Sequence, residues 1–245
     1  MPSLHHLLLL YSLWPSWIIN IRSKQLIGLI IIFVALTTMV GSGLTLDLDN
    51  FISKYFKSIQ GSQSVDAVMI IITSFGDVFT LFIAGIILTI IRRTRKMGMV
   101  FLFAIVILAI LIMYIKPLIG RTIPIYKFEP ALQLPENFVI EYDTPTPFSQ
   151  NLSYPSNHVA LATAFAFIVG FGLNQKSRTA GLLIWSFPVI IAVTRMYIMQ
   201  HYLTDVISGF VLGLIISVIL SKLMSLSQPF SMSRFKGKED TTKTH

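Results

Sequence analysis

Long apolar runs that carry almost no charge restrict the fold of this chain more than any other feature of its sequence. A helix needs about 20 apolar residues to cross the hydrocarbon core of a bilayer. The runs that approach this length are Leu26–Leu44, Val65–Ile91, Met99–Ile115, His158–Leu173, Thr179–Met196 and Leu203–Leu223. They predict an all-α, polytopic membrane protein with about six transmembrane helices.

The composition agrees with a membrane protein. Only 12% of the 245 residues are charged, whereas a soluble domain has about 25%. There is no cysteine, which excludes disulfides, thiolate nucleophiles and cysteine-based metal sites. The formal net charge is +8, and we interpret it as basic loops that face anionic lipid rather than as a surface for nucleic acid.

Basic residues predict the orientation of the spans. They precede the first span and follow the second, fourth and sixth, so all lie on one side if each span crosses. The clusters are Arg22 and Lys24; Arg92, Arg93, Arg95 and Lys96; Lys176 and Arg178; and Lys222, Arg234, Lys236 and Lys238. By the positive-inside rule that side is cytoplasmic, and so are both termini. We therefore expect an N-terminal interfacial or cytoplasmic segment (1–25), a six-span domain (26–225) and a polar cytoplasmic tail (226–245).

The non-cytoplasmic side then holds three connectors. In residues 45–64 the spacing of Phe51, Tyr55 and Phe56 predicts an interfacial amphipathic helix. The connector from Lys116 to Asn157 is long and rich in proline, as functional loops often are.

Ionisable side chains at the ends of membrane helices are costly, so they are candidates for function. By the topology above, six such residues near the later spans lie together on the non-cytoplasmic side, which favours a single site. They are Lys116, Arg121, His158, Arg195, His201 and Asp205.

Several of these residues also have a structural interpretation. Lys116 and Arg195 can be snorkelling anchors. His201 and Asp205 are four apart on one helical face. There the carboxylate can accept the imidazole N–H and leave the other ring nitrogen as a base or nucleophile, or the two can form a structural polar pair.

The segment Pro155–His158 predicts the start of a helix, with Ser156 as a good N-cap. The free backbone N–H groups at a helix N-terminus form an anion site, and His158 beside it can protonate a leaving oxygen. The plainer alternative is a well-capped helix without a ligand.

Taken in order, three short blocks resemble the pattern K-x6-R-P, P-S-G-H and S-R-x5-H-x3-D. Here the blocks are Lys116 with Ile123-Pro124, Pro155–His158, and Thr194-Arg195 followed by His201 and Asp205. Over roughly residues 60 to 225 the chain resembles the type 2 phosphatidic acid phosphatase family, which shares its site with vanadium haloperoxidases.

This resemblance implies a role for each residue. His201 would attack phosphorus and form a phosphohistidine, Asp205 would orient it, and His158 would be the general acid. No metal or other cofactor is implied, because cations and amides can stabilise the phosphoryl charge. The groups implied to hold the phosphoryl oxygens are the side chains of Lys116 and Arg195 and the backbone N–H groups of Ser156 and Asn157.

The sequence departs from the family pattern at three positions. Ile123 replaces an arginine and cannot bind phosphate, and our hypothesis is that Arg121 reaches the site in its place. Asn157 replaces a glycine, and Thr194 replaces a serine but keeps the hydroxyl.

The function implied by the resemblance is metal-independent hydrolysis of a lipid phosphate or an isoprenoid diphosphate, such as a polyprenyl diphosphate. The reaction would take place at the non-cytoplasmic face of the membrane, and membrane lipid would surround the protein. The alternative is a catalytically weak member that binds lipid phosphate without turnover, as Ile123 suggests. A transporter is disfavoured, because transport sites usually lie near the bilayer midplane.

Overall fold

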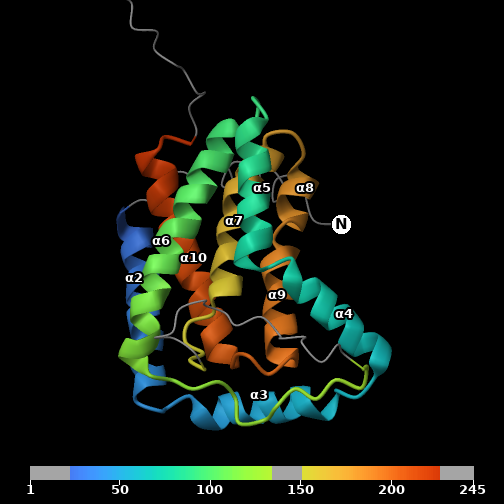
Figure 1. Ribbon diagram of the computed structural model, residues 1–245. Coiled ribbons are helices and arrows are strands. Elements are labelled where there is room, and N and C mark those ends of the chain that lie inside the picture. The colour runs from blue at the N-terminus through green and yellow to red at the C-terminus, as the bar shows by residue number, and fades with distance from the viewer. Residues whose placement is uncertain (1–22, 134–150, 227–245) are drawn as a thin grey trace, which may run out of the picture.

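The structure is a computed structural model that describes residues 23–133 and 151–226 (Figure 1). Within these ranges the chain is helical, with one isolated β-bridge between Thr122 and Leu152. The predicted all-α fold is confirmed. The helices are α2 (Ser23–Gly41), α3 (Leu46–Ser58), α4 (Gln63–Ser74), α5 (Val78–Ile90), α6 (Arg95–Ile119), α7 (Asn157–Asn174), α8 (Arg178–Leu183), α9 (Ser186–Tyr197) and α10 (Leu203–Leu223).

The predicted spans correspond to these helices. By length and hydropathy, α2, α6, α7, the α8–α9 segment and α10 are each able to cross a membrane, and the bent pair α4–α5 makes a sixth span in the described residues. The chain is thus an integral membrane protein with several spans. The expected N-terminal segment and C-terminal tail lie almost wholly outside the described residues.

The second span differs from the prediction. We expected one helix over Val65–Ile91, but the chain bends by 49° between α4 and α5. Asp77 begins α5 as its N-cap, and its Oδ2 accepts the backbone N–H groups of Phe79 at 2.8 Å and Thr80 at 3.2 Å. An apolar run does not reveal such a break, because one capping carboxylate barely changes the mean hydropathy of the run.

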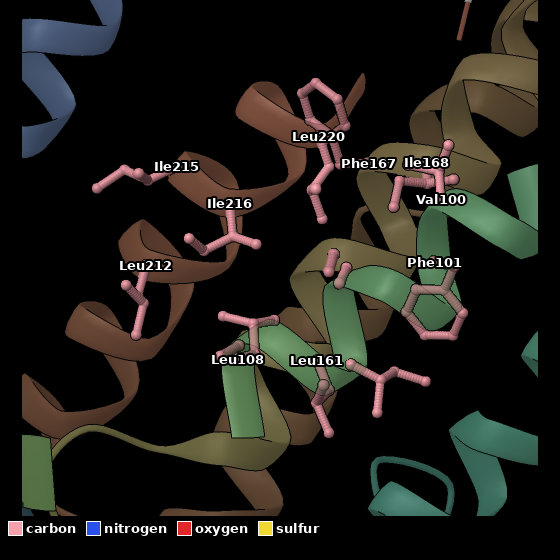
Figure 2. Close-up of a cluster of buried hydrophobic side chains, with 14 of the residues drawn as sticks. Val100, Phe101, Leu108, Leu161, Phe167, Ile168, Leu212, Ile215, Ile216 and Leu220 are labelled. Atoms are coloured by element: carbon pink, nitrogen blue, oxygen red, sulfur yellow. The ribbon is translucent and has the colours of Figure 1, made fainter. Parts of the chain in front are cut away.

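The core lies between α6, α7 and α10 (Figures 1 and 2). Phe101 and Leu108 of α6 pack with Leu161 of α7 and Leu212 of α10. Helix α7 is central and buried on nearly all sides, as expected for a helix without a polar face. In contrast, α2 exposes apolar side chains such as Ile31 to the outside, where lipid would cover them.

Two glycines let α10 approach α7 closely. A Cβ atom built on Gly209 would lie 2.4 Å from the carbonyl oxygen of Ser156, and one on Gly213 would lie 2.4 Å from that of Ala160. Small residues four apart allow close contact between membrane helices. This packing brings the N-termini of α7 and α10 together.

Helix α3 lies crosswise under the end of the bundle at which α7 and α10 begin (Figure 1). Phe51 and Tyr55 are exposed, whereas Asp49 and Ser53 are buried against the bundle. A helix with two distinct faces therefore forms where the sequence predicted one. The basic turns around residues 91–95 and 174–178 lie at the opposite end of the bundle (Figure 1).

Candidate active site

The ionisable residues singled out from the sequence lie at one end of the bundle, above α3. Lys116 is in the last turn of α6, and Arg195 in the last turn of α9. His158 is in the first turn of α7, and Asp205 in the first turn of α10, just after His201. These five are buried, with Lys116 only 1% exposed and Arg195 0% exposed. Charged side chains are rarely buried so completely unless they are paired or functional.

The end of α6 turns the chain back toward α7. Gly120 has a left-handed φ of 67°, and its N–H donates to the Lys116 carbonyl at 2.9 Å, which closes the helix. Ser153 N–H then donates to the Arg121 carbonyl at 2.8 Å. The Lys116 ammonium donates to the Leu152 carbonyl at 2.7 Å. These contacts fix the Lys116 segment beside the chain that leads into α7.

At the start of α7 the structure corrects one expectation. Ser156 is the N-cap residue, but its side chain makes no capping hydrogen bond. Its backbone N–H donates to the Asp205 carbonyl at 3.1 Å, so this group holds α7 to α10 and not a phosphate. Asn157 and His158 are the first two residues of the helix, at its positively polarised N-terminus.

The turn between α9 and α10 positions His201. Met199 adopts a left-handed φ of 56°, and Gln200 N–H donates to the Arg195 carbonyl at 3.1 Å. A left-handed non-glycine residue is uncommon and often marks a functional turn. The turn therefore places His201 directly after the helix end that carries Arg195.

His201 and Asp205 are adjacent, but the hydrogen bond predicted between them is not formed. The imidazole Nδ1 lies 3.7 Å from Oδ2 of Asp205, beyond hydrogen-bond distance. That oxygen instead accepts the Tyr202 N–H at 2.8 Å, as an acid in the first turn of a helix often does. Nδ1 nevertheless faces the carboxylate.

Arg121 reaches the cluster, as hypothesised, but its terminal nitrogens contact protein acids. Nη1 donates to Oδ1 of Asp205 at 2.9 Å and to the Thr204 hydroxyl at 2.7 Å. Nη2 donates to Asp49, and the guanidinium lies 4.2 Å from the centre of the Tyr202 ring. The hypothesis that Arg121 replaces the missing phosphate-binding arginine is thus not supported by these contacts.

Asp49 and Asp66 are two buried acids that the sequence analysis did not select. Asp49 of α3 is fully buried beside Arg121. Asp66 of α4 is also fully buried, and accepts the Tyr197 hydroxyl and, at 2.8 Å, the Ala131 N–H. The sequence held a signal for each of these acids. Asp66 lies inside a predicted span, where a carboxylate is costly, and Asp49 lies on the face of α3 opposite its exposed aromatic residues. Residues 23–133 and 151–226 contain no group of three or more metal-ligating side chains.

Comparisons with known proteins agree with this geometry. The model of the PAP2 superfamily matches residues 98–229, a range that contains all the residues singled out at the helix ends. The chain is 28% identical over 176 residues to an undecaprenyl-diphosphatase of Sulfolobus acidocaldarius, a match that covers 69% of this chain and 77% of that protein. Its fold is similar to the crystal structure of a transmembrane PAP2 type phosphatidylglycerolphosphate phosphatase from Bacillus subtilis. The TM-score is 0.66 at 20% identity, over 84% of this chain and 98% of that one.

Proposed function

The chain belongs to the PAP2 superfamily, and we propose that it is a lipid phosphatase that hydrolyses a lipid phosphate or a polyprenyl diphosphate through a phosphohistidine. One observation carries the proposal: two histidines and two basic side chains from separate parts of the chain are buried together at one end of an apolar bundle. They are His158, His201, Lys116 and Arg195. Buried cations beside imidazole groups suit an anionic ester that needs a nucleophile and a proton donor.

In the proposed reaction His201 is the nucleophile. Because its Nδ1 faces Asp205, Nε2 attacks phosphorus. The bond from phosphorus to the leaving oxygen breaks, and His158 donates a proton to that oxygen. Water then attacks the phosphohistidine, with His158 now accepting a proton, and inorganic phosphate leaves. Asp205 stabilises the positive charge on the imidazole.

Lys116, Arg195 and the N–H of Asn157 are the groups proposed to hold the phosphoryl oxygens. Phosphoryl transfer depends mostly on positioning and charge stabilisation, which fixed cations and helix N-termini supply. We assign Arg121 to the carboxylates instead, because both of its terminal nitrogens donate to Asp49 or Asp205.

The substrate proposed is amphiphilic. A site at the end of a membrane bundle lies at the depth of lipid headgroups, so the apolar chain of the substrate stays in the bilayer. The similarity to an undecaprenyl-diphosphatase supports a polyprenyl diphosphate as the first candidate. We place the site at the non-cytoplasmic face and both termini in the cytoplasm, since the basic turns lie at the other end of the bundle (Figure 1).

Phosphate release from undecaprenyl diphosphate and from phosphatidylglycerol phosphate tests the activity, with purified protein in detergent and EDTA. We expect release from at least one of them and no measurable release by His201→Ala. Rapid quenching should trap an acid-labile phosphoenzyme in the wild type alone. Tight binding of these lipids without release would instead support the catalytically weak alternative.

The absence of cysteine makes the orientation testable. Single cysteines are introduced at Leu44, near α3, and at Arg93, between α5 and α6, and intact cells are treated with a membrane-impermeant maleimide. We expect Leu44→Cys to react and Arg93→Cys to react only after lysis. The reverse pattern would contradict the proposed orientation.

A further inference from the structure

We propose that Asp49 of α3 is a positioning residue for this reaction, and that it acts on Asp205 through Arg121. The inference rests on the proposed function, because it concerns the geometry of the same site. Asp49 lies outside residues 98–229, the part of the chain that matches the family model. It joins the catalytic end of the bundle to a helix that the family pattern does not include.

Asp49 is held by the first turn of α10. Its Oδ1 accepts the Thr204 N–H at 3.0 Å, and its Oδ2 accepts the Thr204 hydroxyl at 2.7 Å. These bonds cap α10 from outside, since the first N–H groups of a helix have no partner within it. The carboxylate therefore has a fixed position relative to the next residue, Asp205.

Arg121 connects the two acids. Its Nη2 pairs with Oδ2 of Asp49, and its Nη1 pairs with Oδ1 of Asp205 at 2.9 Å. Nη1 also donates to the Thr204 hydroxyl, and the guanidinium lies over the Tyr202 ring. A planar guanidinium fixed at both ends has little freedom to rotate.

The orientation of Asp205 then depends on Asp49. The carboxylate is held on one oxygen by Arg121 and on the other by the Tyr202 N–H, and the second oxygen faces His201 Nδ1. Without Asp49, Nη2 of Arg121 loses its carboxylate, and the guanidinium can turn toward Asp205 or toward a bound phosphate. Either movement changes the carboxylate that orients the nucleophile, while Lys116 and Arg195 still hold the substrate.

Asp49→Asn is the first variant, and Asp47→Asn is its matched control. Asp47 lies two residues earlier in α3 and is exposed, so the control removes the same charge from the same helix. We expect Asp49→Asn to lower kcat by about 10- to 100-fold, the order of effect of a misplaced catalytic group, with KM changed less than about twofold. Asp47→Asn should match the wild type.

A double-mutant cycle separates positioning from general damage. If Asp49 acts through Arg121, the variant Asp49→Asn with Arg121→Gln has nearly the kcat of the slower single variant. The proposal would be overturned if the double variant lost kcat by the product of the two single losses. It would also be overturned if Asp49→Asn kept the wild-type kcat or changed only KM.

Thr204→Val covers the case in which Asp49→Asn does not fold. It keeps every charge but removes the hydroxyl that bonds both Arg121 and Asp49. We expect a lower kcat with unchanged KM, and wild-type kcat would overturn the proposal. Failure of the proposed function is distinguishable, because the wild type and Asp47→Asn would then also release no phosphate.

Discussion

The contact between Gly209 and the start of α7 allows a quantitative test of how the site is built. In Gly209→Ala the new Cβ would lie 2.4 Å from the carbonyl oxygen of Ser156, whereas ordinary contact begins at 3.4 Å. The helices must therefore separate by about 1 Å, the difference between these two distances. The oxygen cannot move alone, because it accepts the first intrahelical bond of α7 from Ala160 N–H at 3.1 Å.

The separation of α7 from α10 occurs at the end of the bundle that carries the candidate active site. Ser156 also donates to the Asp205 carbonyl, so the displacement moves His158 away from His201. A misplacement of about 1 Å costs about 10²-fold in rate, and overpacking a tight contact costs about 1–3 kcal/mol of stability. We expect kcat for the lipid phosphate to fall by about that factor, together with a lower thermal midpoint in detergent.

Two other glycines supply the controls. A Cβ atom added to Gly28 in α2 would meet no atom within 4 Å apart from its chain neighbours and the backbone of its own helical turns, so Gly28→Ala should be neutral or slightly stabilising. Gly213→Ala has the same 2.4 Å clash, with the Ala160 carbonyl, one helical turn farther from the site. It should lose stability as Gly209→Ala does but lose less kcat. The reasoning is refuted if Gly209→Ala loses no more kcat than Gly213→Ala.

Three further predictions concern other buried polar groups. Lys116→Met keeps the length of the side chain but removes the charge, and should lower kcat by about 10²–10³-fold in the phosphate-release assay. Asp66→Ala leaves the Tyr197 hydroxyl without its acceptor, and should cost about 1–3 kcal/mol, measured as a lower thermal midpoint. Burial raises the pKa of Tyr154 above its usual 10.0 because it disfavours the ionised phenolate, so the stability that the neutral phenol contributes is complete below pH 10 and is lost as the pH rises through the folded value. Tyr154→Phe should therefore be less stable than the wild type by about 1 kcal/mol at pH 8, with a smaller difference at pH 11.

The number of spans and the location of the ionisable residues followed from the sequence, because both depend on strong local signals. Charge is so costly in a bilayer that Lys116, His158 and Arg195 stand out in their apolar surroundings. In the structure these residues lie in the terminal turns of their helices, at one end of the bundle. Their catalytic roles stay a proposal.

What the sequence did not predict depends on tertiary contacts. The partners of Arg121 could not be known, because Asp49 belongs to a connector whose helix had to be placed under the bundle before its inner face was defined. The bend before α5 needs one carboxylate, Asp77, to be recognised as a cap inside an apolar run. The Ser156 N–H was assigned to an anion because nothing in the sequence shows that the Asp205 carbonyl would reach it.

The network of Asp49, Arg121 and Thr204 also has a consequence for biosynthesis. Asp49 and Thr204 are 155 residues apart in the chain, and Asp49 and Arg121 are 72 apart. Because a chain emerges from the ribosome N-terminus first, Asp49 and Arg121 enter the membrane long before α10 exists. Thr204 and Asp205 arrive only with α10, so a nascent chain that has not yet inserted α10 can pair Asp49 with Arg121 but cannot form the contacts of these two residues with Thr204 and Asp205. The network is therefore completed only after α10 has been inserted.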